Sequence, residues 1–336
     1  MSDKKVCKIT SIGGQALLEG IMMKGPHKTV MATRLPDKTI DIEELPEKHA
    51  RDKFKPFGWP IIRGSVNMIE SLITGYKALM KSAEKLGIDE DDEEVKESWL
   101  YRVFGEKLMA VIGGIAGVLG VALALLLFMW LPTVVFNLVN GIVTPGVSLS
   151  FPVKAVEGGI LDSWKGVFEG VLKIIIFLGY IALTALMKDI KRTYMYHGAE
   201  HKSIFCYEKG LPLTVENVRK QIRFHPRCGT SFLVLVLVVS ILVSSLVLKI
   251  FPTLKTVTWL WMIVKILLIP VIMGFGYELI RFCGKHDNLL SKIVSAPGLW
   301  VQRLTTKEPE DDMIEVAIAA LTEVIPENPE DDVWGK

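Results

Sequence analysis

Apolar residues gather in four blocks along the chain, each bounded by polar stretches. The blocks occupy residues 108–131, 171–187, 231–248 and 257–276. Each approaches the roughly 20 consecutive apolar residues that a helix needs to cross a bilayer. The second block contains Lys173 near its outer end, where a lysine can snorkel to the headgroups, and the fourth contains Lys265 and Pro270. The pattern predicts a mainly α, polytopic membrane helix bundle with about four spans.

Basic residues are distributed unequally between the loops. The 132–170 loop contains only Lys154 and Lys165. The 188–230 loop contains Lys188, Lys191, Arg192, Lys202, Lys209, Arg219, Lys220, Arg223 and Arg227. Loops rich in Lys and Arg stay in the cytoplasm, so we expect this loop and, with four spans, both termini on the cytoplasmic side of a bacterial inner membrane. The opening residues include no continuous apolar core, so no cleavable signal peptide is predicted.

This topology has a consequence for the cysteines. Cys7, Cys206, Cys228 and Cys283 all fall in segments predicted to be cytoplasmic. The cytoplasm keeps thiols reduced, so a disulfide framework is not expected.

Residues 1–100 form a small cytoplasmic α+β segment in this interpretation. Two alternating runs, 29–34 and 39–43, flank a turn-forming Leu-Pro-Asp-Lys sequence and predict a β-hairpin. Apolar positions at helical spacing over 61–85 predict an amphipathic helix, which either packs on the hairpin or bundle or lies on the bilayer. The transmembrane bundle then covers residues 101–282. A cytoplasmic C-terminal segment, 283–336, contains a helix over 313–325.

The opening stretch 11–26 is apolar and punctuated by glycines. It lacks both the glycine order of a dinucleotide-binding loop and the final Lys-Ser/Thr of a P-loop. Tight packing of this backbone against another element is the favoured reason for the glycines, with a phosphate-binding loop as the alternative.

The strongest chemical motif follows the second apolar block. His197, Glu200 and His201 have the spacing H-x-x-E-H. Residues four apart share one face of a helix, so both imidazoles can reach one metal ion, and zinc is the ion that this order favours. This is the inverted zincin order, in which the glutamate acts as general base, so Glu200 is predicted to activate a metal-bound water.

The next metal ligand is left open by the sequence. His225 and Cys228 immediately precede the third block, and Glu278 lies at the inner end of the fourth. Each has an ordinary structural role as its alternative. Cys228 could be an inert buried thiol, and Glu278 could pair with Arg281 or Lys265.

Four sequence blocks carry a family resemblance. They are the opening 13–26, the central His-Gly-Ala-Glu-His-Lys, the Phe-His-Pro-Arg-Cys-Gly-Thr-Ser over 224–231 and the Pro-Gly-Leu-Trp-Val-Gln-Arg-Leu-Thr-Thr-Lys-Glu-Pro over 297–309. In this order they resemble the YqhQ-like family of uncharacterised bacterial membrane proteins. That family is described as a predicted metal-dependent enzyme with no established reaction and no assigned ligands. The resemblance therefore implies membrane location first and catalysis second.

Three functions are consistent with these features. The first is a metal-dependent hydrolase at the cytoplasmic face, acting on a membrane-associated peptide or an anionic lipid-linked group. The second is a non-catalytic scaffold or regulatory protein whose structural metal has four ligands, such as His197, His201, His225 and Cys228. The third is a transporter, for which the spans offer few polar residues. The lipid bilayer is the expected partner, and nucleic acid is not.

Overall fold

A computed structural model of the chain describes residues 9–46, 54–87, 106–144, 159–286 and 288–332. They belong to two compact units. The first, here called the sheet unit, combines Met1–Asp89, Tyr180–Leu235 and Gly276–Lys336; the second, the bundle unit, combines Glu90–Gly179 and Val236–Phe275. The chain thus enters each unit more than once, whereas the domains predicted from the sequence are consecutive segments.

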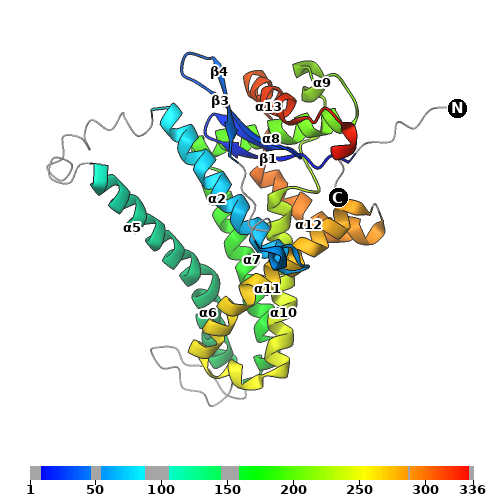
Figure 1. The fold of residues 1–336 in the computed structure, drawn as a ribbon. Coiled ribbons are helices and arrows are strands. Elements are labelled where there is room, and N and C mark those ends of the chain that lie inside the picture. The colour runs from blue at the N-terminus through cyan, green and yellow to red at the C-terminus, as the bar shows by residue number, and fades with distance from the viewer. Residues whose placement is uncertain (1–8, 47–53, 88–105, 145–158, 287, 333–336) are drawn as a thin grey trace. The chain divides into compact units, whose positions relative to one another are not determined.

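The sheet unit is built on a four-stranded antiparallel sheet of order β1-β2-β3-β4 (Figure 1). Its strands are β1 (Gly13–Leu17), β2 (Gly20–Lys24), β3 (Thr29–Arg34) and β4 (Ile40–Leu45). The β3–β4 pair confirms the predicted hairpin. The β1–β2 pair was not predicted, because glycines inside a strand weaken the alternating pattern that indicates one.

Side-chain alternation places the sheet between two helical layers. Ile21, Met23, Val30 and Ala32 share one core with α8 (Lys188–Glu208) and α13 (Asp311–Val324). On the other face, Met22 and Met31 share a second core with Ala78 of α2 (Ile62–Lys85). Both faces of the sheet are therefore covered, as a sheet with apolar residues at odd and even positions requires.

Helix α2 packs through its small residues. Its buried positions are Gly64, Gly75, Ala78, Ser82 and Ala83. The large residues that define its amphipathic pattern, Ile69, Leu72, Ile73 and Tyr76, are instead exposed. The sequence predicted that this helix either packs on the hairpin or bundle or lies on the bilayer. The two are compatible, because the small-residue face packs on the sheet and the face with the large apolar residues is left uncovered among the described residues.

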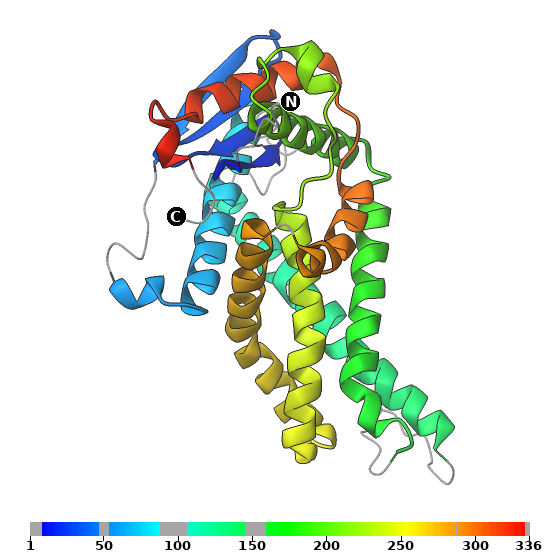
Figure 2. The ribbon, with the colours of Figure 1, turned by 90° about the vertical axis from the view of Figure 1, so that its right-hand side faces the viewer.

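The structure describes four helices long and apolar enough to cross a membrane, so the chain is a membrane protein. They run over Gly117–Val143, Asp162–Thr184, Gly229–Ile250 and Thr258–Lys285. The first continues from α5 (Glu106–Leu125) through the π-helical turn η2 (Leu126–Trp130) into α6 (Leu131–Val143). The others contain α7 (Lys165–Thr184), α10 (Gly229–Ile250) and α11 (Thr258–Lys285). Figure 2 shows α10 and α11 antiparallel, joined by η4 (Pro252–Lys255).

Three span boundaries differ most from the predicted ones. The fourth span continues past residue 276 to Lys285. The first span extends past residue 131, because the helix continues through Pro132, which directly follows the π-helical turn η2, to Val143. Helix α7 begins at Lys165 rather than at 171, because Lys165 and Glu169 are both buried inside the bundle unit. Lys173 therefore lies deeper along its helix than the apolar block indicated.

The remaining elements are short or peripheral. Helix α12 (Leu289–Thr305) is capped at its N-terminus by Asn288, whose side chain accepts a hydrogen bond from the Ser291 backbone N–H at 2.8 Å. The others are η1 (Lys55–Gly58), η3 (Asp162–Trp164), α9 (Val215–Arg219) and η5 (Pro329–Asp331).

Candidate metal centre

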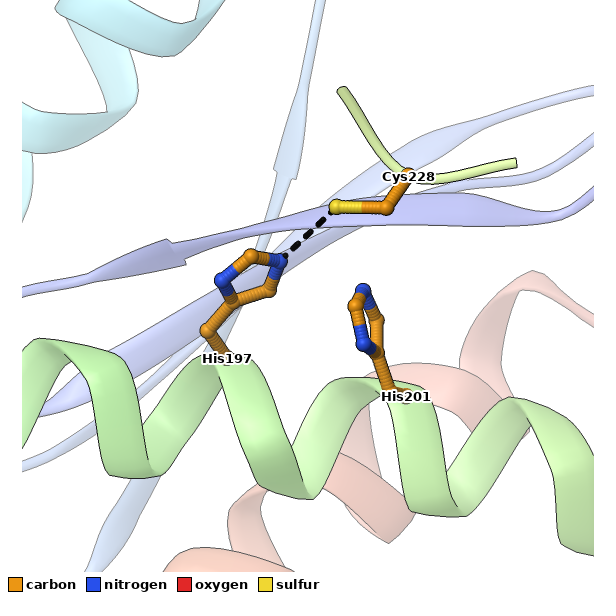
Figure 3. Close-up of side chains that lie close together, drawn as sticks. All are labelled: His197, His201 and Cys228. Atoms are coloured by element: carbon orange, nitrogen blue, oxygen red, sulfur yellow. Dashed lines mark hydrogen bonds between the residues drawn. The ribbon is translucent and has the colours of Figure 1, made fainter. Parts of the chain in front are cut away.

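Helix α8 presents the two motif histidines to a third potential ligand (Figure 3). His197 and His201 lie one turn apart with ring centroids 4.4 Å from each other. Cys228, from the segment that enters α10, lies against the same side of α8. One ligand atom from each of these three residues lies within 4.8 Å of the other two. Two imidazole nitrogens and one thiol form a donor set that zinc favours.

Backbone carbonyls fix the orientation of both imidazoles. His197 Nδ1 lies 2.9 Å from the Thr305 carbonyl oxygen, and His201 Nδ1 lies 2.5 Å from that of Arg223. A carbonyl can only accept, so each Nδ1 donates and Nε2 is the nitrogen left to face the centre. This outer hydrogen bond is the arrangement that holds metal-binding histidines in place.

The two Nε2 atoms differ in their present contacts. His197 Nε2 lies 3.1 Å from the Cys228 sulfur. His201 Nε2 is buried and has no hydrogen-bond partner among the residues that the structure describes. A buried ring nitrogen without a partner is costly, and a bound cation would satisfy it.

The environment of Cys228 favours its metal-binding form. Burial alone raises the pKa of this thiol, but its electrostatic and hydrogen-bonding interactions with His197 and His201 outweigh burial, so the pKa lies well below its usual value. The thiolate is the form of cysteine that binds metals.

Glu200 lies on the same helix and is 4% exposed. Burial raises the pKa of its carboxyl group, and the nearby His201 and His197 oppose that rise. The Gly14 backbone N–H donates to the carboxylate, while Oε2 has no partner within the described part of the chain. One carboxylate oxygen is therefore oriented and the other is free to accept a proton, as a general base requires.

Gly14 allows β1 to approach Glu200 this closely. A Cβ atom at position 14 would lie 2.7 Å from the Met22 carbonyl oxygen and 3.1 Å from Glu200 Cδ. The contact agrees with the packing interpretation of the glycine-punctuated opening. Nothing in the sequence indicated that the packing partner would be Glu200.

Two further contacts hold α8 in register with its surroundings. Glu19, at the β1–β2 turn with a φ of +47°, accepts hydrogen bonds from Arg192 at 2.5 and 2.6 Å. A Cβ at Gly198 would lie 2.0 Å from the Lys307 carbonyl oxygen, so only glycine permits the segment after α12 to run beside His197. Sequence reasoning missed these positioning residues, because their contacts join segments far apart in the chain.

Comparison with known proteins identifies the family. A family model described as "Protein of unknown function (DUF1385)" matches residues 59–327. The chain belongs to this family. The "Uncharacterized protein YqhQ" of Bacillus subtilis (strain 168) is 36% identical to it over 314 residues, which cover 93% of this chain and 92% of that protein. No solved structure matches the chain.

The comparisons confirm the resemblance to YqhQ-like proteins. The DUF1385 description names no activity. Neither comparison assigns the chain a metal or a reaction.

The other two predicted ligands of this DUF1385 chain have different partners. His225 lies near His201, with ring centroids 5.5 Å apart, but its Nε2 is 3.2 Å from an Arg227 nitrogen and 3.8 Å from Glu208 Oε2. Burial lowers the pKa of His225 to about 4, although the hydrogen bond with Glu208 opposes this, so the ring is neutral. It lies outside the group of three ligand atoms.

Glu278 is bound to an arginine that the sequence did not suggest. Both of its oxygens accept from Arg63, at 2.7 and 2.6 Å. Arg63 donates both of these hydrogen bonds, and the charge of Arg281, one of the two partners predicted from the sequence, also acts on this carboxylate. The carboxylate is occupied by this bidentate pair and lies outside the group of three.

Proposed function

We propose that this membrane protein is a metal-dependent hydrolase in which His197, His201 and Cys228 hold a divalent metal, zinc by preference, and Glu200 is the general base. The observation that carries the proposal is the convergence of three ligand atoms within 4.8 Å of one another. The hydrogen bonds from the two imidazoles to backbone carbonyls support it, because they leave both Nε2 atoms directed at the centre.

The donor set fits a catalytic zinc. Three protein ligands leave one coordination position open, whereas a structural zinc has four. A zinc ion held by these residues would supply Lewis acidity and would lower the pKa of water toward neutrality. Glu200 takes the proton from the attacking water on its free oxygen and returns it to the leaving group. A membrane-associated peptide and an anionic lipid-linked group are the substrate classes we propose.

A structural metal site is the alternative, and it needs a fourth protein ligand. Apart from His197, the imidazole beside His201 is that of His225, with ring centroids 5.5 Å apart, but its ring is already held by Arg227 and Glu208. This arrangement favours the catalytic reading over the scaffold.

We expect the metal to depend on the two motif histidines. Purified wild-type protein should contain about one zinc ion per chain, and the His197→Ala/His201→Ala double variant should contain almost none, since it loses two of three ligands. Elemental analysis measures this directly. His27→Ala, which replaces an exposed histidine of the sheet unit, is the matched control and should keep the wild-type content. Equal metal content in the double variant and the wild type would remove the basis of the proposal.

The proposed location is the bacterial inner membrane, with the sheet unit in the cytoplasm. The core of this unit supports a shared side, because Ile12, Tyr196 and Met313 pack together although they come from the N-terminal segment, the 188–230 loop and the C-terminal segment. A bilayer cannot separate elements that share one core. The lysines and arginines of the 188–230 loop favour the cytoplasm as that side.

Cysteine labelling of intact cells tests this orientation. With the native cysteines replaced, a single cysteine in the 188–230 loop should resist an impermeant maleimide, and one in the 132–170 loop should react. Permeabilised cells provide the control, since both positions should then react. Labelling of the 188–230 position but not of the other in intact cells would show that the orientation is reversed.

A further inference from the structure

The bundle unit contains a cavity of about 200 Å³ that the proposed metal centre does not use. Its walls are mostly apolar and come from η2, α7, α10 and α11. The cavity lining also contains two lysines, Lys173 and Lys265, and two serines, Ser240 and Ser244. Charged residues in a membrane bundle are rare, and they mark functional sites by default.

Lys265 is fully compensated. Its Nζ lies 2.5 Å from Glu169 Oε2 and 2.7 Å from Thr133 Oγ1. Glu169 Oε2 also lies 3.3 Å from the Trp261 indole nitrogen. Lys265 and Glu169 therefore form a hydrogen-bonded buried pair of zero net charge, as a low-dielectric interior requires.

Lys173 is not compensated in this way. Its ammonium group has no hydrogen bond or ion pair with any residue in the described ranges, and the nearby Glu169 is already paired with Lys265. Lys173 lies about two helical turns, roughly 12 Å, along α7 from Lys165, so it is not at the end of its helix. A span over 171–187 would put Lys173 near its outer end, where its side chain could reach the headgroups. The longer helix puts Lys173 away from its end, so this explanation of the charge fits less well.

From this cavity and its unpaired cation we infer a binding site for the anionic head of a single-chain amphiphile, such as a fatty acid. Lys173 would hold the carboxylate in a charge-assisted hydrogen bond. Leu268, Ile269 and Ile272 would contact the first carbons of the chain. The volume is below the roughly 300–1,000 Å³ of most small-molecule pockets, so it suits a head and part of one chain rather than a whole phospholipid.

The site can be tested with the full-length protein in phosphatidylcholine nanodiscs. A diazirine derivative of palmitate should label α7, α10 or α11 saturably, and unlabelled palmitate should compete. Hexadecanol has the same chain without the charge, and acetate has the charge without the chain, so both should compete at least tenfold more weakly, given the strength of hydrogen bonds to charged groups. Equal competition by palmitate and hexadecanol, or by palmitate and acetate, would overturn the inference.

Lys173→Met provides the second arm, because methionine keeps an unbranched apolar side chain and removes the charge. It should raise the half-saturating concentration of the palmitate probe by about tenfold to a hundredfold. Lys249→Met, at an exposed lysine of α10 outside the cavity, is the matched control and should leave that concentration unchanged. Unaltered labelling of Lys173→Met, or equal weakening in the control, would contradict the assignment.

The thermal midpoint of the same variant separates a binding lysine from a structural one. An unpaired charge destabilises the bundle, so the midpoint of Lys173→Met without added palmitate should equal or exceed that of the wild type. A lower midpoint would show that Lys173 supports the fold and would count against the site.

Discussion

Glu200→Gln is expected to lower activity by about 10²–10⁴-fold, the usual loss when a general base is removed, while metal content and membrane insertion are retained. Glutamine keeps the size of the side chain and can still accept the Gly14 N–H hydrogen bond, but it cannot take up a proton. The practical measurement is complementation of a deletion phenotype, with protein abundance and bound metal determined in parallel.

A purely structural role for Glu200 predicts a different result. If the carboxylate served only to pair with the buried histidines, its loss would leave charge unpaired at a cost of about 3–5 kcal/mol and would reduce the amount of folded protein. Glu44→Gln, at an exposed position of β4, is the matched control and should behave as wild type. Full complementation by Glu200→Gln at normal abundance would exclude the catalytic role.

The largest stability effect is expected in the bundle unit, at the Lys265–Glu169 pair. Both side chains are almost fully buried, at 3% and 2% exposure. Glu169→Gln or Lys265→Met alone should lower the free energy of unfolding by about 3–5 kcal/mol, because each leaves its partner charged and unpaired. The double variant should recover most of this loss, since it buries no net charge. Thermal unfolding in detergent or nanodiscs measures the three differences.

An exposed ion pair serves as the reference for these three variants of the buried pair. Glu216 and Lys220 face solvent on one turn of the sheet unit, so Glu216→Gln should cause no measurable change in stability. If the effects of Glu169→Gln and Lys265→Met were simply additive in the double variant, the two residues would not be coupled and the pair would not hold the bundle together.

The sequence by itself determined the membrane character of the chain and the position of the histidine motif. Transfer to lipid depends on the length and composition of a continuous segment, so the four apolar blocks were sufficient to predict the spans. Helical periodicity likewise sufficed to place His197 and His201 on one face of α8. The β3–β4 hairpin followed from alternation and a local turn.

The pattern of apolar residues predicted the ends of the spans less well than their existence. Lys165 and Glu169 interrupt an apolar run, and a composition rule places such residues outside the bilayer. The structure keeps both within the helix, because each finds polar partners on other helices of the bundle unit. Whether a charge is tolerated inside a bundle depends on those partners, which local sequence does not specify.

Only the tertiary structure decided which residues join the two histidines. Cys228 reaches them because its segment folds back onto α8, whereas the nearby His225 is held by Glu208 and Arg227. Glu278 has suitable chemistry but is bound by Arg63. The Gly14 contact with Glu200 joins a strand and a helix that are far apart in the chain. Such contacts depend on how distant segments pack, and periodicity, which describes only neighbours along the chain, carries no information about them.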